Sequence, residues 1–313
     1  MPLHKTVISI AVQSARCEGL FVIKSVKKII SGAALSVAVF AQPVLSQSGD
    51  SARYYGGDAR PVKHIHDARQ LRQGESVYWL DHANIVNSNV SSPPNYFSIG
   101  GYWGVSDRWQ LGAVLTSTYG LRSTFSGLLD TDGVGTIGAH AKYQLAQWGD
   151  WNLAVMGAIE YINWQQSVPV GGRLMSASPA GSVHLPVTYA PSEMFALSGS
   201  LSYALLPQYS RKGGEVGQIF SIGGGVNINP AGPFSFHGSL DYPISGENRL
   251  GSGGNLDKLA IWSVGARADL GQGWALDLTA SNGYASTPTT KLLSNQRKDA
   301  FLVTLGVSKK LGR

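Results

Sequence analysis

The residues of this chain that could carry chemistry are few, and the most suggestive are a histidine and a serine two positions apart, His237 and Ser239. Residues at i and i+2 of a strand point to the same side. The spacing could therefore place a base beside a nucleophile, as nucleophilic catalysis requires. Only geometry establishes a triad, and two-residue coincidences are common in strands. His237 and Ser239 are weak catalytic candidates on this evidence.

Three further sequence patterns give weaker indications of a functional site. His64 and His66 alternate without a nearby carboxylate cluster, so a solvated segment is a better interpretation than a metal site. The run Gly223–Gly225 lies in a predicted strand with no following helix, unlike a phosphate-binding loop, and suits close strand packing. The single cysteine, Cys17, falls in a predicted leader, which excludes disulfides from the mature chain. We expect no metal and no cofactor.

The elements that position these residues follow first from composition. The chain has 313 residues, of which 14% are charged and 39 are glycine, whereas soluble domains carry about 25% charged residues and about 7% glycine. Its mean hydropathy of -0.02 is too polar for a bundle of membrane helices, and the mature region contains no apolar stretch near the roughly 18 residues of a spanning helix. A β-barrel fits, because its strands face lipid on one side and a polar lumen on the other.

The N-terminal region resembles an export signal. Residues 24–46 combine a basic run, a short apolar core and small residues near the end, which predicts a secretory signal peptide over 1–46. Cleavage after Ser46 or after Ala41 is open, and Val22 could be the true start, which would make residues 1–21 a mis-assigned leader. Residues 47–74 do not alternate and are interpreted as a periplasmic lead-in, with a short plug inside a barrel as the alternative.

Charge gives no support to a nucleic-acid partner. The chain has a formal net charge of +6, but five of its 25 basic residues and only one of its 19 acidic residues precede residue 47. The remainder has 20 basic and 18 acidic residues, a small and dispersed excess.

Four segments share a hairpin pattern, in which a tight turn and an aromatic residue precede strict alternation of apolar with small or polar side chains. They read GVSDRWQLGAVL, AQWGDWNLAVMG, NPAGPFSFHGSL and LGQGWALDLTA. Three of the apolar faces begin with Trp and end with Tyr ten residues later. Ten residues at about 3.3 Å each and a tilt near 45° climb roughly 23 Å, close to the apolar band of an outer-membrane barrel.

Apolar and polar side chains would also alternate along the strands of a soluble sandwich. Aromatic residues at both edges of the apolar band distinguish a membrane barrel from it. The predicted interface girdle comprises Trp109, Tyr119, Trp151, Tyr161, Phe234, Tyr242, Trp274 and Tyr284.

Extending the pattern predicts an all-β fold, a closed antiparallel transmembrane barrel of about twelve strands over residues 75–313. The strands are expected at 75–88, 95–105, 109–119, 134–146, 151–164, 181–190, 193–207, 216–229, 233–243, 257–270, 273–285 and 298–311. Short connections alternate with longer ones, expected at 89–94, 120–133, 165–180, 208–215, 244–256 and 286–297. Short periplasmic turns and longer external loops are typical of this class, and an even strand count returns both termini to the periplasm. The first and sixth strands rest on the weakest patterns, the sixth on parity alone.

The same alternation predicts which charged residues line the lumen. Both signs occur, with no ladder of one sign, and most other inward positions are small, which favours a narrow open pore. Each single charge is explained as well by pairing across the wall. The predicted lumen-lining residues are His140, Lys142, Glu160, His237, Asp241, Arg267, Asp269 and Asp277.

The pattern as a whole resembles the bacterial outer-membrane β-barrel class, over about 240 residues and without a family-specific motif. It is most similar to small monomeric substrate channels, and the GVSDRWQL hairpin resembles the phenol-degradation channel group. The resemblance implies passive passage of small polar solutes by a monomer surrounded by outer-membrane lipid and lipopolysaccharide. Many such barrels end on an aromatic residue read by the assembly machinery, whereas this chain ends Lys310-Leu311-Gly312-Arg313.

Two other functions remain as alternatives. Outer-membrane phospholipase A is similar in using a His and a Ser so spaced, which makes a lipid-modifying barrel enzyme the second hypothesis. The flanking residues differ, and parity places His237 and Ser239 in the lumen rather than at the lipid face. A sealed structural or adhesive barrel is the third hypothesis, and loops of at most about sixteen residues favour it little.

Overall fold

A computed structural model describes residues 66–86, 95–118, 133–168, 172–211, 214–230, 232–250, 256–283, 287–294 and 301–312. Residues Met1–Gln47 form a unit of their own, apart from Ser48–Arg313. The predicted signal peptide over 1–46 lies outside the described residues and stays a prediction. Every described strand belongs to the second unit.

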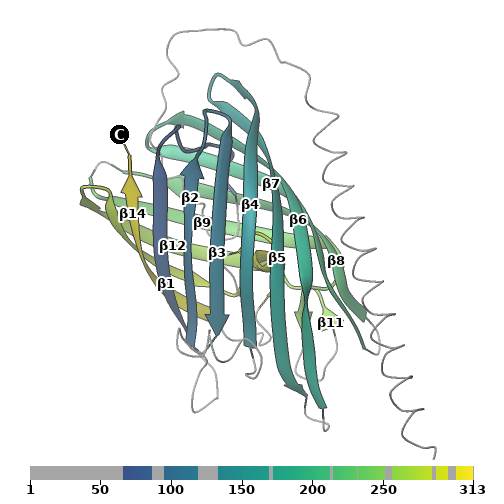
Figure 1. The fold of residues 1–313 in the computed structure, drawn as a ribbon. Coiled ribbons are helices and arrows are strands. Elements are labelled where there is room, and N and C mark those ends of the chain that lie inside the picture. Colours follow the sequence, from purple (N-terminus) through teal and green to yellow (C-terminus); the bar gives the residue numbers. More distant parts are fainter. Residues whose placement is uncertain are drawn as a thin grey trace, which may run out of the picture. The chain divides into compact units, whose positions relative to one another are not determined.

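Within the described residues, twelve strands close into one antiparallel barrel (Figure 1), as the alternation predicts. Neighbours around the wall follow the chain order, and the first and last strands pair to close it, from Ser76 with Leu311 to Val86 with Phe301. Closure gives each of these strands a partner on both sides, which removes the exposed edges of an open sheet. The strands are β1 (Ser76–Val86), β2 (Asn95–Gly104), β3 (Trp109–Thr118), β4 (Gly133–Trp148), β5 (Trp151–Val168), β6 (Gly172–Ser192), β7 (Phe195–Arg211), β8 (Gly214–Ile228), β9 (Phe234–Ser245), β12 (Ile261–Gly271), β13 (Trp274–Ser281) and β14 (Phe301–Leu311).

Tight turns gather at one end of the barrel, which also holds the start of β1 and the end of β14. Trp148 pairs with Trp151 across one of these turns, and Gly271 pairs with Trp274 across another. The N–H of Gly74, just before β1, donates to the carbonyl of Gly104 at 2.9 Å, which fixes the entry to β1 beside the β2–β3 turn. We call this end the short-turn end.

The two faces of the wall invert the rule for soluble proteins. Along β13, Trp274, Leu276 and Leu278 are exposed on the outside, while Asp277 and Thr279 are buried on the inside. Strands in this register put every second side chain toward lipid and the others toward the lumen. A soluble sandwich would bury the leucines and expose the aspartate, so that alternative is wrong.

Four consecutive strands run longer than the sequence predicts. β5 and β6 continue pairing as far as Val168 and Gly172, and β7 and β8 as far as Arg211 and Gly214. The loops expected at 165–180 and 208–215 are therefore largely strand. The sixth strand, which rested on parity alone, is the longest at 21 residues.

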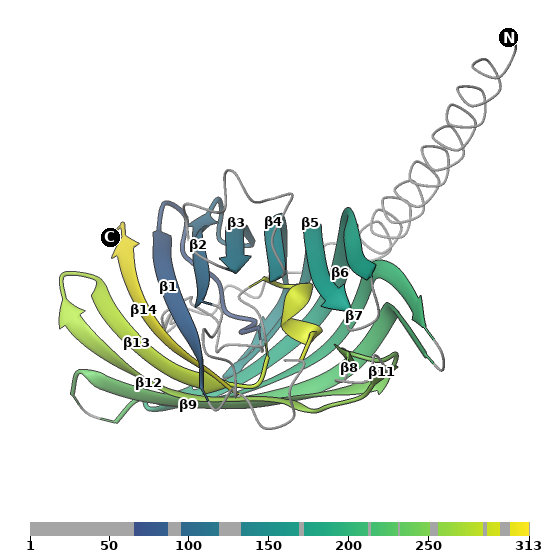
Figure 2. The same ribbon diagram turned by 90° about the horizontal axis from the view of Figure 1, so that it is seen from below.

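Two small elements lie in the connections at the opposite end. β10 (Arg249–Leu250) and β11 (Leu256–Asp257) pair with each other between β9 and β12. A 3-10 helix, η1 (Thr290–Leu292), lies between β13 and β14, and Figure 2 shows it in yellow inside the ring of strands. None of the described helices is long and apolar enough to cross a membrane.

Candidate functional site: a partly filled barrel lumen

The inner wall carries the charged residues that alternation assigns to the lumen. His140, Lys142 and Glu160 are almost completely buried on β4 and β5, and so are Asp241 and Asp277 on β9 and β13. Two more, His237 on β9 and Arg267 on β12, are half-buried. Asp269 differs, because it is exposed and accepts a hydrogen bond from the N–H of Gly271 at 2.8 Å, at the β12–β13 turn.

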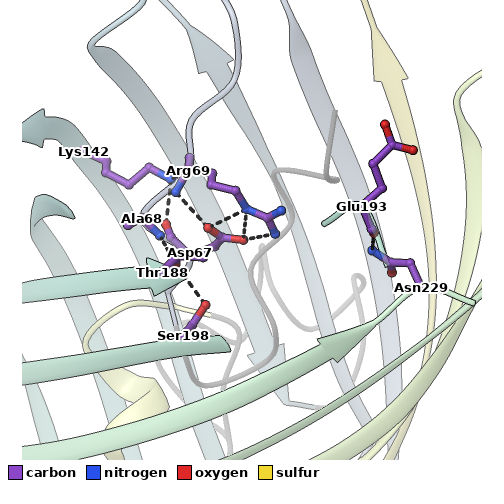
Figure 3. A network of polar contacts seen from close by, with 8 residues as sticks. All are labelled: Asp67, Ala68, Arg69, Lys142, Thr188, Glu193, Ser198 and Asn229. Carbon is purple, nitrogen blue, oxygen red and sulfur yellow. Dashed lines mark hydrogen bonds and ion pairs between the residues drawn. The ribbon is translucent and has the colours of Figure 1, made fainter. Parts of the chain in front are cut away.

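The segment before β1 lies inside the barrel (Figure 3). The N–H of Ala68 donates to Thr188 Oγ1 on β6 at 2.9 Å, and Lys142 Nζ donates to the backbone carbonyls of Asp67, at 3.0 Å, and of Arg69. Arg69 forms a bidentate ion pair with Asp67. Burial alone raises the pKa of Asp67, but the Arg69 and Lys142 charges outweigh it and lower that pKa below its usual value. Asp67 is therefore ionised at neutral pH.

An apolar cluster anchors the same segment near the short-turn end. Leu71 is 1% exposed and packs with Val77, Trp79 and Tyr102 from β1 and β2. Its N–H donates to Gln110 Oε1 at 3.0 Å. For residues 66–72 the structure thus has the plug that was the alternative, where a periplasmic lead-in was expected. Inside the barrel Leu71 is removed from water, and the backbone donors exchange water for the side-chain acceptors of Thr188 and Gln110.

A second segment fills the lumen from the connection between β13 and β14. Glu160 Oε2 accepts a hydrogen bond from Thr287 Oγ1 at 2.6 Å, and its Oε1 accepts one from the N–H of Thr289 at 2.7 Å. Thr289 Oγ1 also lies 2.9 Å from Ser182 Oγ on β6. Glu160 thereby holds the loop by both carboxylate oxygens.

Leucines complete the attachment of this loop. Leu292 and Leu293 are buried in a cluster with Ile162 of β5 and Ile219 of β8, together with inward alanines. An external loop was expected at 286–297, and its described part, 287–294, instead lies within the barrel. Two adjacent leucines in an otherwise polar connection were the available signal, since an exposed loop has no use for them.

The two inserted segments meet at His184 on β6. The rings of His66 and His184 pack edge-on with centroids 4.6 Å apart, and His184 bonds Ser182 and Ser202 through its two ring nitrogens at 2.8 Å each. Burial, with the Lys291 charge adding to it, lowers the pKa of His66 well below its usual value. Burial also lowers the pKa of Lys291 to about 8, although the Asp241 carboxylate opposes the shift.

The remaining wall, from β7 to β9 and on to β12, is lined differently. Most of its inward side chains in the short-turn half are small or polar and half-buried, whereas further from the short turns Ile219, Asp241 and Ser263 are buried. Arg267 lies 3.8 Å from Asp277 and donates to Ser308 Oγ at 3.0 Å, so its charge is held against the wall. The half-buried inward residues are Ser198, Asn227, Ser235, His237, Ser239 and Arg267.

The catalytic candidates lie on this accessible wall and are engaged by neighbouring strands. His237 Nε2 lies 3.2 Å from Thr279 Oγ1 on β13, and Ser239 Oγ lies 2.5 Å from Ser263 Oγ on β12. Both face the lumen, between the exposed Phe236 and Leu240 of the outer face. The described residues contain no group of three or more His, Cys, Asp or Glu that could hold a metal, and His64 lies outside them.

Aromatic residues mark the edges of the outer face. The predicted girdle residues Trp109, Trp151, Tyr161, Phe234, Tyr242 and Trp274 are all exposed on it, and Tyr119 and Tyr284 lie outside the described residues. Trp151 also contacts Tyr189, with centroids 4.7 Å apart, and stacks with Trp148 at 6.4 Å. Trp148 and Tyr189 were not among the predicted girdle residues, because they lie at strand ends outside the apolar faces of the four hairpin patterns.

Comparisons with known proteins support the fold and nothing finer. No family model matches the chain, and no curated protein matches it. Among solved structures it is similar to the NanC porin, at 9% identity and a TM-score of 0.53, over 75% of this chain and 100% of that one. It is also similar to an outer-membrane channel from Pseudomonas putida F1, at 16% identity and a TM-score of 0.45, over 78% and 98%. Outer membrane phospholipase A from Escherichia coli matches at 9% and 0.43, over 74% and 92%. The predicted resemblance is confirmed at the level of architecture: the chain has the closed twelve-stranded β-barrel fold found among outer-membrane porins and channels.

Proposed function

We propose that the protein is an outer-membrane channel for passive passage of small polar solutes. The observation that carries the proposal is the unequal lining of the lumen. The inserted segments cover the inner face of β4–β6 and reach Ile219 on β8, whereas Ser198, Asn227 and Ser239, in the short-turn half of β7–β9, stay half-buried. Side chains fill an eight-stranded barrel, while sixteen strands leave a water channel. Twelve strands with two inserts leave a narrow route beside the small residues.

The placement in the envelope is part of the same proposal. A signal peptide, cleaved after Ser46 or Ala41, exports the chain, and the short-turn end with both termini faces the periplasm. The exposed apolar band with its aromatic edges contacts membrane lipid, including lipopolysaccharide. The barrel-assembly machinery inserts it, and it acts as a monomer that binds no nucleic acid.

A lipid-modifying enzyme receives less support. A hydrolase acting on membrane lipid needs its nucleophile at the lipid face, whereas Ser239 faces the lumen beside Ser263. The similarity of the fold to the NanC porin fits a non-enzyme.

Single-channel recording in a planar bilayer tests the proposal, with the mature protein, residues 47–313, refolded in detergent. Discrete and stable current steps are expected, and their reversal potential in a salt gradient reports the dominant lumen charge. A correctly folded but silent barrel would contradict the channel. A lipid-hydrolysis assay on wild type and Ser239→Ala completes the test, because activity lost in the variant would establish the enzyme instead.

A further inference from the structure

The outer face of the barrel carries an apolar groove over β6–β9. In Figure 1 these neighbouring strands lie on the right and at the back of the barrel. Three outward-facing glycines from three strands form its floor: Gly199 on β7, Gly224 on β8 and Gly238 on β9. Gly199 pairs directly with Gly224, and Gly238 lies one strand further and diagonally adjacent. The groove is shallow and open along the outer face, with a volume of about 540 Å³.

The three groove glycines differ from the inward-facing glycines in the atoms that an added Cβ would meet. A Cβ added to Gly112 would lie 2.1 Å from His140 Nε2, and one added to Gly138 would lie 2.6 Å from Glu160 Cγ. The lumen side therefore needs glycine to accommodate its large side chains.

On the groove side nothing in the described part of the chain requires glycine. The nearest atom to an added Cβ would be 3.4 Å away at Gly199 and 3.8 Å away at both Gly224 and Gly238, which is ordinary contact. None of the three has the positive φ that favours glycine. The missing side chains leave a hollow that the described residues of the barrel do not occupy.

The walls of the hollow match the environment of a lipid tail. Leu197 and Leu240, 45% and 55% exposed, flank the glycines, and Trp151 with Tyr189 closes the end nearest the short turns. Aromatic pairs of this kind sit at the level of lipid headgroups. The groove thus runs from an interfacial edge into the apolar band.

We propose that this groove binds one acyl chain of a phospholipid. The short-turn half of the wall faces the inner leaflet if the short turns are periplasmic, and the headgroup would then lie beside Trp151. A flexible acyl chain can enter the groove, and each methylene that it buries is favourable. A second copy of the chain is the competing occupant, and the test below distinguishes it from lipid.

The inference rests on the proposed membrane location but not on conduction. Its test therefore uses lipid contact and no current. The mature protein is reconstituted in vesicles of phosphatidylethanolamine and phosphatidylglycerol that contain a trace of phosphatidylethanolamine with a diazirine on one acyl chain. After illumination, mass spectrometry of peptides locates the labelled residues.

We expect labelling to concentrate on the strand segments around Gly199, Gly224 and Gly238. Gly224→Leu fills the groove and should lower labelling there roughly tenfold, since each methylene displaced from an apolar site costs a few-fold in affinity. Gly157→Leu is the matched control: Gly157 lies on the outer face of β5 with no described atom within 4 Å of an added Cβ and does not line the groove. Its labelling pattern should equal that of wild type.

Gly199→Ala gives a milder second variant that the backbone accepts, so the test does not depend on one substitution. Heat-modifiable migration on gels checks that every variant folds. Even labelling around the whole wall, or labelling unchanged in folded Gly224→Leu, would overturn the proposal. A folded dimer whose β7–β9 segments escape labelling would do the same and would assign the groove to a second copy.

Discussion

The two sides of the lumen satisfy their polar groups in opposite ways. On β4–β6, Glu160, Lys142 and Thr188 each bond an atom of an inserted segment, from 66–72 or 287–294. On β9 and β12, inward hydroxyls bond each other across the wall, as Ser239 does with Ser263. Buried polar groups need partners. One side obtains them from chain that fills space, and the other from neighbours that leave space free.

This difference distinguishes inward residues that hold an inserted segment from inward residues that only line the lumen. On β4 and β5, Lys142 and Glu160 bond backbone that lies inside the barrel, whereas Ser239 bonds Ser263 on the adjacent strand. The solvent route is therefore expected where the inward side chains are small. Removing an inserted segment, or weakening a hydrogen bond that holds one, should therefore make the two sides of the lumen equally accessible.

Removing the segment before β1 should have the largest effect. A mature chain that begins at Gln73 lacks the contacts of Ala68 and Leu71 with Thr188 and Gln110. We expect its single-channel conductance to rise by roughly twofold or more, because a twelve-stranded lumen lies between the filled and the open sizes. Planar-bilayer recording measures the step.

A chain that begins at His64 is the control for this truncation. It loses the residues before the segment but keeps the segment itself, so its conductance should equal that of residues 47–313. If both truncations give the same step, the segment does not narrow the route, and the comparison between the two sides fails.

Glu160→Ala should release the other insert. It leaves the N–H of Thr289 without its acceptor and removes one partner of the Thr287 hydroxyl, and an unsatisfied buried group costs about 1–3 kcal/mol. The barrel should stay folded, because the cost falls on the loop rather than on the ladder. Hydrogen exchange at Thr289 should accelerate, with more frequent current fluctuations. Glu160→Gln keeps one acceptor oxygen and should behave in between; an alanine variant with native exchange at Thr289 would show that the leucines hold the loop alone.

The sequence predicts the wall well because membrane and lumen impose opposite polarity on alternate residues. Wherever both faces are constrained, as in Trp274–Ser281, the period of two is visible and the strand is found. Beyond the membrane neither face must be apolar. The stretch from Gly172 to Ala180 therefore loses its alternation and includes Pro179, yet it pairs with β5 throughout. The loop prediction at 165–180 was wrong for this reason.

The inserts were beyond local patterns. Ala68 bonds a residue 120 positions away, and Thr289 one 129 positions away. Alternation states that Glu160 points inward but not what it meets there. Leucines in otherwise polar segments, Leu71 before β1 and Leu292 with Leu293 after β13, carried the hint, because a solvated segment would not need them. Alternation thus assigns inward positions one by one, and it does not give the partners of the residues there.

Glycine substitutions sharpen the contrast between the filled lumen and the outer wall. Gly112→Ala places a Cβ against His140 and should destabilise the barrel by about 1–3 kcal/mol, the usual cost of overpacking. Gly199→Ala meets only ordinary contacts and should stay within about 0.5 kcal/mol of wild type. Urea unfolding in lipid vesicles measures both. Equal losses at the two positions would mean that backbone flexibility, rather than space, requires these glycines.

The smallest expected effect is electrostatic and concerns Lys291 at the meeting point of the inserts. Because its pKa is lowered to about 8, its charge is largely present at pH 7 and largely absent at pH 9. His66, with its lowered pKa, stays neutral over this range, and Asp241 is the nearby carboxylate. Raising the pH should therefore remove one positive charge and shift the reversal potential toward cation preference.

Lys291→Arg isolates this group, because a guanidinium stays charged throughout the range. Other titrating groups contribute equally to wild type and variant, so the difference between their pH profiles belongs to Lys291. A smaller shift in the variant is the expected result. Identical profiles would mean that the solute route does not sense the inserted loop. The route would then run along the short-turn half of β7–β9, more than a Debye length of roughly 8–10 Å from Lys291.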